Sequence, residues 1–469
     1  MIHKWAIAAT FSLCAISALN AFSLQDGTKE VITTHPVVLE RLHNYRATLE
    51  DLRTTEAQFL PTLDYTGSLS REKTKAPVTN QVNRSFTAYD HSLQLTQNLF
   101  NGFGSLYEID YNKARIVSAS YHYVENVNDL AFSFVTAYVN AVKMRDILII
   151  AEANVKYHED ITVKVQKLFD AGLTTRSEFE KADTLLSLAK SNLVVAQNNR
   201  DDALFNLERV YGKRVTMEDL QKINFAGELP DSLESMREYA RLHNPSILVT
   251  HYNIKAASAQ KKAAYKGYYP SIDAFARQSW ASDTGGLAGN DDRTKLGLTL
   301  SYNLYRGGVD QALIQKSLSK INQESEIQRD TLRKLDEQGS LSWAARKNIT
   351  NQIEHLKKYE ASSKKTIELF QREYDLGRRT LLDLLVAQSD HIAAQTQIVR
   401  AENDLLMAHY RIQDAMGNMV SSILGTQKDE VFSTVGLNAL DNRSDNDDRV
   451  NTMFFADRKS GKYQQDTEK

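Results

Sequence analysis

The chain has 469 residues, of which 42% are hydrophobic, and 57 Lys and Arg against 59 Asp and Glu give it a formal net charge of -2. A charge so close to neutral argues against a nucleic-acid-binding surface or an acidic tether. Its six prolines leave long gaps, with none between Pro77 and Pro230 and none after Pro270. Because proline breaks helix interiors, these gaps permit very long helices.

Residues 1–23 are interpreted as a secretory signal peptide. Lys4 precedes an apolar run, and Ala-Phe-Ser at 21–23 supplies small residues for cleavage. The run is too short for the alternative, a membrane anchor. The only cysteine, Cys14, lies inside this segment, so we expect no disulfide or thiolate chemistry in the mature protein.

The rest of the chain reads as a tandem duplication. Leu99-Phe100-Asn101-Gly102 recurs about 205 residues later as Leu304-Tyr305-Arg306-Gly307, whereas His35-Pro36 recurs after about 209 residues as Asn244-Pro245. Since loops absorb length changes, the difference is expected in a loop upstream of the corner. We predict a first repeat over 24–225, a second repeat over 226–437, and a polar, disordered tail over 438–469.

Each half is predicted to run helix, strand, loop, strand, long helix, turn, long helix. Residues 296–304 alternate apolar with small or polar side chains, as do 62–69 and, more weakly, 89–95, which is the pattern of a transmembrane β-strand. The strand opened by Pro270 is the least regular. Polar loops are expected over 71–84 and 282–293, the latter containing Asp291 and Asp292.

Long helices are expected after each glycine-rich corner. Apolar residues follow coiled-coil spacing in two adjacent rows, a pattern that suits a helix packed between several neighbours. The first row is Leu130, Phe134, Ala137, Ala141, Met144, Leu148, Ala151 and Val155, and the second is Ala131, Val135, Tyr138, Val142 and Ile149. The interval from Gly102 to Gly172 would span about 100 Å as a helix.

Four strands in each chain cannot close a barrel, for which about eight is the smallest workable number. An open sheet edge is not tolerated in lipid, because unpaired backbone groups there cost several kcal/mol each. The chain is therefore expected to oligomerise. A dimer would supply eight strands and a trimer twelve, and a conducting pore favours the trimer.

The duplicated strand-to-helix corners (99–104 and 304–308) and the glycine-centred turns between long helices together resemble the TolC family of outer-membrane channels of Gram-negative bacteria, over about residues 31–425. This resemblance implies a mixed α and β membrane protein. Its homotrimer would form a 12-stranded outer-membrane β-barrel, four strands per chain, continued by a periplasmic α-helical coiled-coil barrel. It also implies contact with outer-membrane lipid, a periplasmic adaptor and an inner-membrane ABC or RND transporter, in type I protein secretion or drug efflux.

The same resemblance implies a periplasmic gate. Tyr374 and Arg379 match the family's latch residues, Glu178 takes the place of their acidic partner, and Asp383 matches the first aspartate of a constriction ring. The second ring aspartate aligns with Val386, a departure from the family. The adaptor-docking tips are expected at Gly172, Leu173, Thr174, Gly377 and Arg378.

Other chemistry finds little support. Gly102-Phe103-Gly104 lacks the third glycine of a dinucleotide loop, the histidines show no metal-ligand spacing, and no catalytic set can be assembled. We therefore expect no enzyme activity, no cofactor, no metal and no nucleic-acid partner. The Asp291-Asp292 pair could bind calcium, but an exposed hairpin loop is favoured. A structural, adhesin-like periplasmic coiled-coil protein without channel activity is the alternative function, and the amphipathic strands argue against it.

Overall fold

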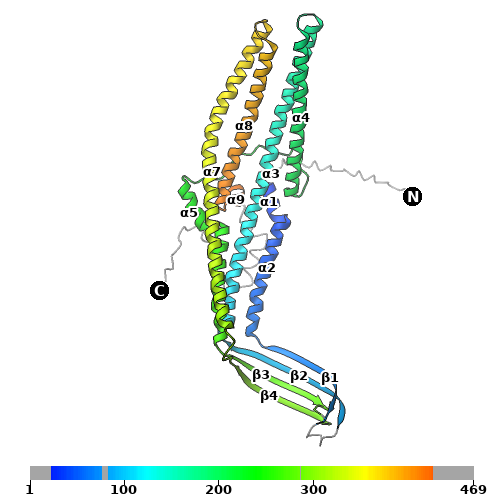
Figure 1. The fold of residues 1–469 in the computed structure, drawn as a ribbon, viewed down its shortest axis with the longest axis vertical. Coiled ribbons are helices and arrows are strands. Elements are labelled where there is room, and N and C mark those ends of the chain that lie inside the picture. The colour runs from blue at the N-terminus through cyan, green and yellow to red at the C-terminus, as the bar shows by residue number, and fades with distance from the viewer. Residues whose placement is uncertain (1–22, 76–82, 286, 426–469) are drawn as a thin grey trace, which may run out of the picture.

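The computed structural model describes residues 23–75, 83–285 and 287–425. The predicted signal peptide, except Ser23, and the predicted polar tail lie outside these ranges. The molecule is elongated, with a β-sheet at one end and two helical hairpins reaching the other (Figure 1). Among the described residues, no helix contains an apolar stretch long enough to cross a membrane.

The first half runs from two short helices through two strands into two long helices. In chain order these are α1 (Leu24–Thr34), α2 (Pro36–Glu56), the 3-10 turn η1 (Ala57–Phe59), β1 (Thr62–Thr74), β2 (Arg84–Asn101), α3 (Gly104–Asp170) and α4 (Arg176–Tyr211). The predicted order of elements is confirmed for this half.

The second half has the same order. Its elements are α5 (Leu233–His243), α6 (Pro245–Ala264), η3 (Tyr265–Tyr268), β3 (Ser271–Ser282), β4 (Asn290–Ser301), α7 (Val309–Asp375), α8 (Leu381–Ala415) and a final short α9 (Met419–Leu424). Helices α3 and α7 are each 67 residues long. The long helices predicted from the proline gaps are thus present in both halves.

The recurring residue–proline pairs begin corresponding helices. His35 caps α2 by accepting a hydrogen bond from the backbone N–H of Val37 at 3.3 Å. Asn244 caps α6 in the same way, accepting from the backbone N–H of Ser246 at 2.9 Å. The proline that follows each cap suits the first helical position, where its missing donor costs nothing.

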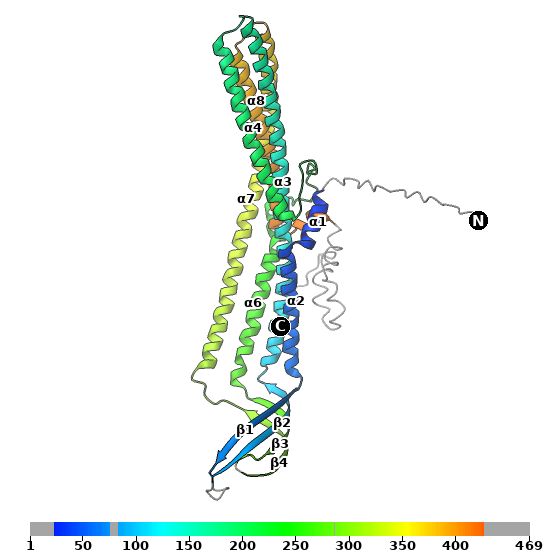
Figure 2. The ribbon, with the colours of Figure 1, turned by 90° about the vertical axis from the view of Figure 1, so that its right-hand side faces the viewer.

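Helices α4 and α8 bury a line of small residues against their long partners. An alanine returns at every seventh position, which keeps it on one face of the helix and lets a neighbouring backbone approach closely. The buried alanines are Ala182, Ala189, Ala196 and Ala203 in α4, and Ala387, Ala394, Ala401, Ala408 and Ala415 in α8. Side by side, α3 packs with α4 and α7 with α8 (Figure 2).

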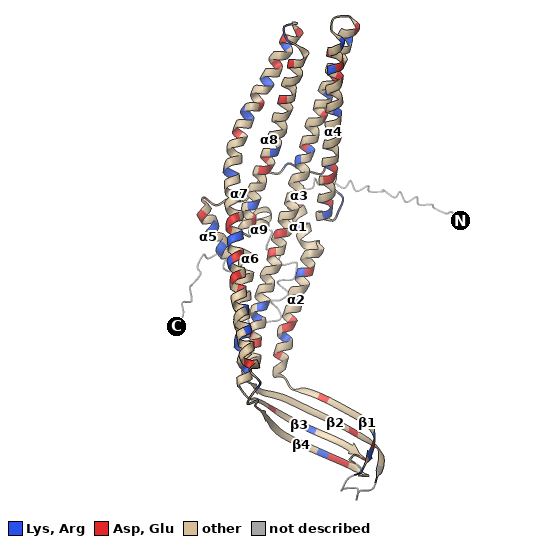
Figure 3. Ribbon diagram, viewed as in Figure 1, with Lys and Arg blue, Asp and Glu red and all other residues tan. Residues whose placement is uncertain are grey.

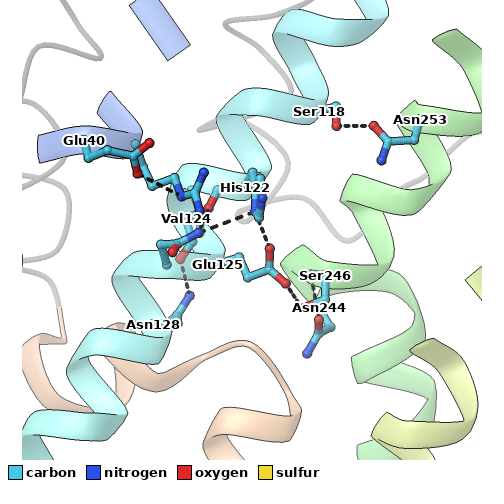
Figure 4. A network of polar contacts seen from close by, with 11 residues as sticks. Glu40, Ser118, His122, Val124, Glu125, Asn128, Asn244, Ser246 and Asn253 are labelled. Atoms are coloured by element: carbon cyan, nitrogen blue, oxygen red, sulfur yellow. Dashed lines mark hydrogen bonds and ion pairs between the residues drawn. The ribbon is translucent and has the colours of Figure 1, made fainter. Parts of the chain in front are cut away.

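A polar network fixes the middle of α3 to α6 (Figure 4), and one further hydrogen bond joins α3 to the start of α9. The Glu125 carboxylate accepts a hydrogen bond from Ser246 at 2.5 Å and lies 2.6 Å from the His122 ring. Asn128 accepts from the backbone N–H of Val420 at 3.1 Å. Burial raises the pKa of Glu125, but the hydrogen bonds from His122 and Ser246 outweigh it, and the net pKa lies below the ordinary value.

The four strands form one antiparallel sheet in the order β1-β2-β3-β4. Their register gives two different faces. One face is mainly apolar and carries exposed leucines and aromatic residues, among them Leu63, Tyr65, Leu69, Leu93, Leu95, Trp280, Leu296, Leu298 and Leu300. The opposite face is mainly polar, because successive side chains of a strand alternate between faces.

Some sequence predictions about element limits are wrong. Strand β4 ends at Ser301 and not at Leu304, because its partner β3 begins at Ser271, which pairs with Ser301. Leu304 therefore has no partner strand within the described chain. Asp291 and Asp292 were expected in a loop, but they lie inside β4, opposite Ala281 and Trp280; likewise β1 continues through Thr74, into the loop expected at 71–84.

The double apolar row of α3 is confirmed for most of its length. Phe134, Ala131 and Val135 are fully buried, since they belong to a core that α3 shares with α1, α2, α4, α8 and α9. Ile149, expected in the second row, is instead 55% exposed. It lies beyond the start of α6, on a stretch of α3 with fewer neighbours.

Candidate functional site: the helical tips

Two tight turns lie at the end of the molecule opposite the sheet (Figure 1). We call residues 171–175, between α3 and α4, the first tip, and residues 376–380, between α7 and α8, the second tip. A hydrophobic cluster behind them joins all four helices. Its members are Tyr157, Ile161, Val165, Phe179, Ala182, Leu185, Ile367, Phe370, Tyr374, Leu381, Leu384 and Leu385.

Both tips end their long helix with a left-handed glycine. Gly172 has a φ of 70° and Gly377 a φ of 71°. In the first tip, Gly172 N–H donates to the Phe169 carbonyl at 2.9 Å and Leu173 N–H to the Leu168 carbonyl at 2.8 Å. This paired pattern is the Schellman motif. A Cβ added at either glycine would meet nothing within 4 Å, so glycine serves the backbone conformation here and not a close contact.

The following helices start with threonine caps. Thr175 accepts a hydrogen bond from the Glu178 N–H, and Thr380 from the Asp383 N–H. Asp383 completes a capping box, since its carboxylate accepts from the Thr380 backbone N–H at 3.4 Å; it also accepts from the Thr380 hydroxyl at 2.8 Å. Glu178 and Asp383 are thus both the third residue of their helix. The capping role of Asp383 was not foreseen, although the Thr-x-x-Asp spacing could have signalled it.

Arg379 makes its contacts on its own hairpin. Its Nε lies 2.9 Å from Glu373 Oε2, its Nη1 lies 4.0 Å from Asp383 Oδ2, and the guanidinium stacks over the Phe370 ring at 4.1 Å. The Glu178 carboxylate accepts a hydrogen bond from Thr174. Within the described part of the chain no ion pair joins Arg379 to Glu178, so that pairing stays a prediction about the assembled entrance.

The structure does bring Tyr374 and Glu178 together across the two hairpins. Tyr374 packs in the tip cluster. Burial raises the pKa of its hydroxyl, and the nearby Glu178 carboxylate raises that pKa further. The phenol is therefore held in its neutral form, which can donate a hydrogen bond.

The two tips differ in chemistry although their backbones match. Leu173 is 75% exposed in the first tip, where the second tip carries Arg378. Leu376 of the second tip is 70% exposed. Loops held by a rigid scaffold often carry binding residues, and contact of these tips with an adaptor stays a prediction. Among the described residues no group of His, Cys, Asp and Glu is placed to hold a metal ion.

Comparison with known proteins agrees with the architecture. The profile of the family described as "Outer membrane efflux protein" matches residues 29–213 and again 237–418. The chain belongs to this family. The two matched ranges cover the two halves that share one order of elements, and the family expected from the corner and turn motifs is confirmed.

Individual relatives are distant but matched over most of their length. Outer membrane efflux protein BepC of Brucella suis is 26% identical, covering 77% of this chain and 78% of the relative. Outer membrane protein TolC of Escherichia coli is 23% identical, covering 87% and 85%. The CmeC outer membrane channel of Campylobacter jejuni superimposes with a TM-score of 0.76 at 16% identity, covering 87% of this chain and 89% of that chain, which shows a shared fold.

Proposed function

We propose that this protein is a passive export duct of the outer membrane and periplasm. Three copies form a 12-stranded barrel in the outer membrane, and their long helices continue it as a periplasmic tunnel. The duct works with a periplasmic adaptor and an inner-membrane ABC or RND transporter, in type I protein secretion or drug efflux.

The observation that carries this proposal is the sheet. One of its faces is apolar and exposed, as lipid contact requires, and the other is polar, as a water-filled lumen requires. Among the described residues, its outer strands, β1 and β4, each pair on one side only. Because a membrane cannot accommodate open edges, β4 of one copy is expected to pair with β1 of the next.

The helices support the same proposal. At 1.5 Å per residue, α3 and α7 are each about 100 Å long, far longer than a compact domain needs. The matched lengths of α3 and α7 and the double family match support an internal duplication. Such a repeat lets three chains supply six similar hairpins around one axis.

The test uses the protein extracted from outer-membrane fractions. Chemical cross-linking is expected to give a three-chain species that migrates compactly until it is boiled, and planar bilayers are expected to show stable conductance. Monomers alone with conductance retained would overturn the trimer. Absence of both trimer and conductance would favour the structural, adhesin-like alternative.

Loss of the gene separates the two transport roles. A secretion duct predicts the disappearance of a protein from the culture medium with drug tolerance unchanged. An efflux duct predicts increased sensitivity to small toxic compounds with the secreted proteins unchanged.

A further inference from the structure

Two basic residues lie directly opposite each other on the polar face of the sheet. Arg277 of β3 pairs in register with Lys295 of β4. Both side chains are exposed, and Figure 3 shows basic and acidic residues on these strands. Like charges at directly opposed positions destabilise a sheet, so this juxtaposition needs a compensating interaction.

The described residues do not supply that compensation. No ion pair is formed by Arg277 or Lys295 within them, whereas Arg293, two residues from Lys295 on the same face, is neutralised by Asp291. The nearest acidic residue of the same cross-strand row is Asp64 on β1. Gln94 of β2 lies between Asp64 and Arg277, which puts Asp64 two strands away, or about 9–10 Å.

Arg277 and Lys295 also share one cross-strand row, or level, of the sheet. One row towards the helices, Phe275 lies opposite Gly297, and the next row holds Asp273, hydrogen-bonded to Asn98 at 2.7 Å. Towards the other end, Arg293 and Asp291 form their own pair. Among the described residues, the level of Arg277 and Lys295 thus carries two cations and one carboxylate, Asp64, which lies two strands away from Arg277.

We propose that Arg277 and Lys295 of the three copies form an anion-binding ring inside the barrel. The inference rests on the proposed function, because only a closed barrel turns the polar face into a lumen. A passage lined by one sign of charge concentrates counter-ions. The ring therefore binds carboxylate or phosphate groups of the exported cargo as they pass, and those groups replace the missing acidic partner.

One competing arrangement is specific. If Asp64 of the next copy faced Lys295 across the β4–β1 junction, Lys295 would be neutralised by assembly and would serve trimer stability. The two arrangements differ in what neutralising Lys295 does. The ring predicts altered anion binding in a stable trimer, and the junction pair predicts a less stable trimer with anion binding unchanged.

The experiment measures block of single-channel current in planar bilayers by inositol hexakisphosphate, added on the side of the sheet hairpins. The wild type is expected to be blocked. In Arg277→Gln/Lys295→Gln the half-blocking concentration is expected to rise about tenfold, as loss of a close multi-charge contact predicts. Lys73→Gln is the matched control, since Lys73 lies on the opposite face near the hairpin end of β1, and it should leave the block unchanged.

Three results would overturn the ring. They are equal block of the wild type and the double variant, an equal effect of the Lys73 control, and a lowered trimer melting temperature in both Lys295→Gln and Asp64→Asn with block unchanged. If the wild type forms no conducting trimer at all, the proposed function itself fails. Trimer formation and conductance are measured before any anion is added, so a failure of the proposed function can be told apart from a failure of the anion-binding ring.

Discussion

At the scale of single residues, the packing of Gly297 is the clearest local requirement of the sheet. A Cβ built at Gly297 would lie 3.1 Å from two ring carbons of Phe275 on the neighbouring strand. An aromatic side chain lying across a strand glycine is a known way to stabilise such a site. The glycine therefore makes room for the ring and is not needed for an unusual backbone angle.

We predict that Gly297→Val destabilises the assembled protein by about 1–3 kcal/mol, the usual cost of overpacking. The midpoint of the heat-induced loss of the oligomeric band would measure it. Thr299→Val, two residues along the same face, is the control and should have little effect. Equal midpoints for Gly297→Val and wild type would show that Phe275 can move aside without cost.

His158 is a second residue whose surroundings have a measurable consequence. It is 4% exposed in α3, and its Nδ1 has no hydrogen-bond partner among the described residues. Burial lowers its pKa below the ordinary value of 6.5. The folded state then resists protonation while the unfolded chain accepts it, so stability is fully present above pH 6.5 and falls as the pH drops towards the folded pKa.

We predict that His158→Leu makes stability less dependent on pH between about 7 and 5. The measurement is the midpoint of chemical unfolding, followed by helical circular dichroism at a series of pH values. His355→Leu, at an exposed position of α7, is the matched control and should keep the slope of the wild type. An unchanged slope in His158→Leu would place the acid sensitivity in other buried groups.

At the scale of elements, helices were predictable because their signals are local. Proline gaps, apolar spacing and left-handed glycines all act within a few turns of one helix, and α3 ends two residues before Gly172 as the sequence indicates. Strand limits were less predictable. The end of β4 at Ser301 depends on where β3 begins, 30 residues away, and no local pattern at Leu304 carries that information.

The tip glycines allow a prediction about whole elements. Gly172→Val and Gly377→Val put a β-branched residue into a left-handed conformation, which costs about 1–2 kcal/mol at each site. No neighbour lies within 4 Å of the added Cβ, so the strain should distort the turn and not the packing of the helices. We expect export to be lost while trimers still assemble.

The readouts are secretion or drug tolerance in cells, together with cross-linking for assembly. Gly285→Val is the control, since Gly285 has the same left-handed strain at the sheet end, with no neighbour within 4 Å. It should leave export intact. Full export by both tip variants would remove the tips from adaptor docking.

At the scale of the whole molecule, contacts that form only in the assembled trimer are the hardest to predict from the sequence of one chain. The helix cap to which Asp383 contributes and the proximity of Tyr374 to Glu178 are both present in the single folded chain. The proposed pairing of Arg379 with Glu178 of the other hairpin instead requires Glu178 to displace Glu373, whose carboxylate lies 2.9 Å from the guanidinium in this chain. No spacing within the sequence decides such a competition.

The gate prediction belongs to this scale. In the closed trimer we expect Arg379 to exchange Glu373 for Glu178 across the entrance, with Tyr374 donating its hydroxyl and Asp383 of the three chains lining the constriction. An exposed ion pair contributes about 0–1 kcal/mol. Three copies together with tip packing could bias the closed state by a few kcal/mol, which is enough to set its population. An adaptor–transporter complex that binds the open form better would then open the entrance.

Arg379→Ser combined with Tyr374→Phe is therefore expected to raise single-channel conductance in planar bilayers. Asp383→Asn, which keeps a side-chain oxygen for the Thr380 cap, should weaken block by divalent cations at the periplasmic side without unfolding the start of α8. Glu373→Gln is the informative comparison. If Glu373 competes with Glu178 for Arg379, its removal should favour closure and lower the conductance. Conductance equal to wild type in the Arg379/Tyr374 variant would mean that packing in the tip cluster alone holds the entrance shut.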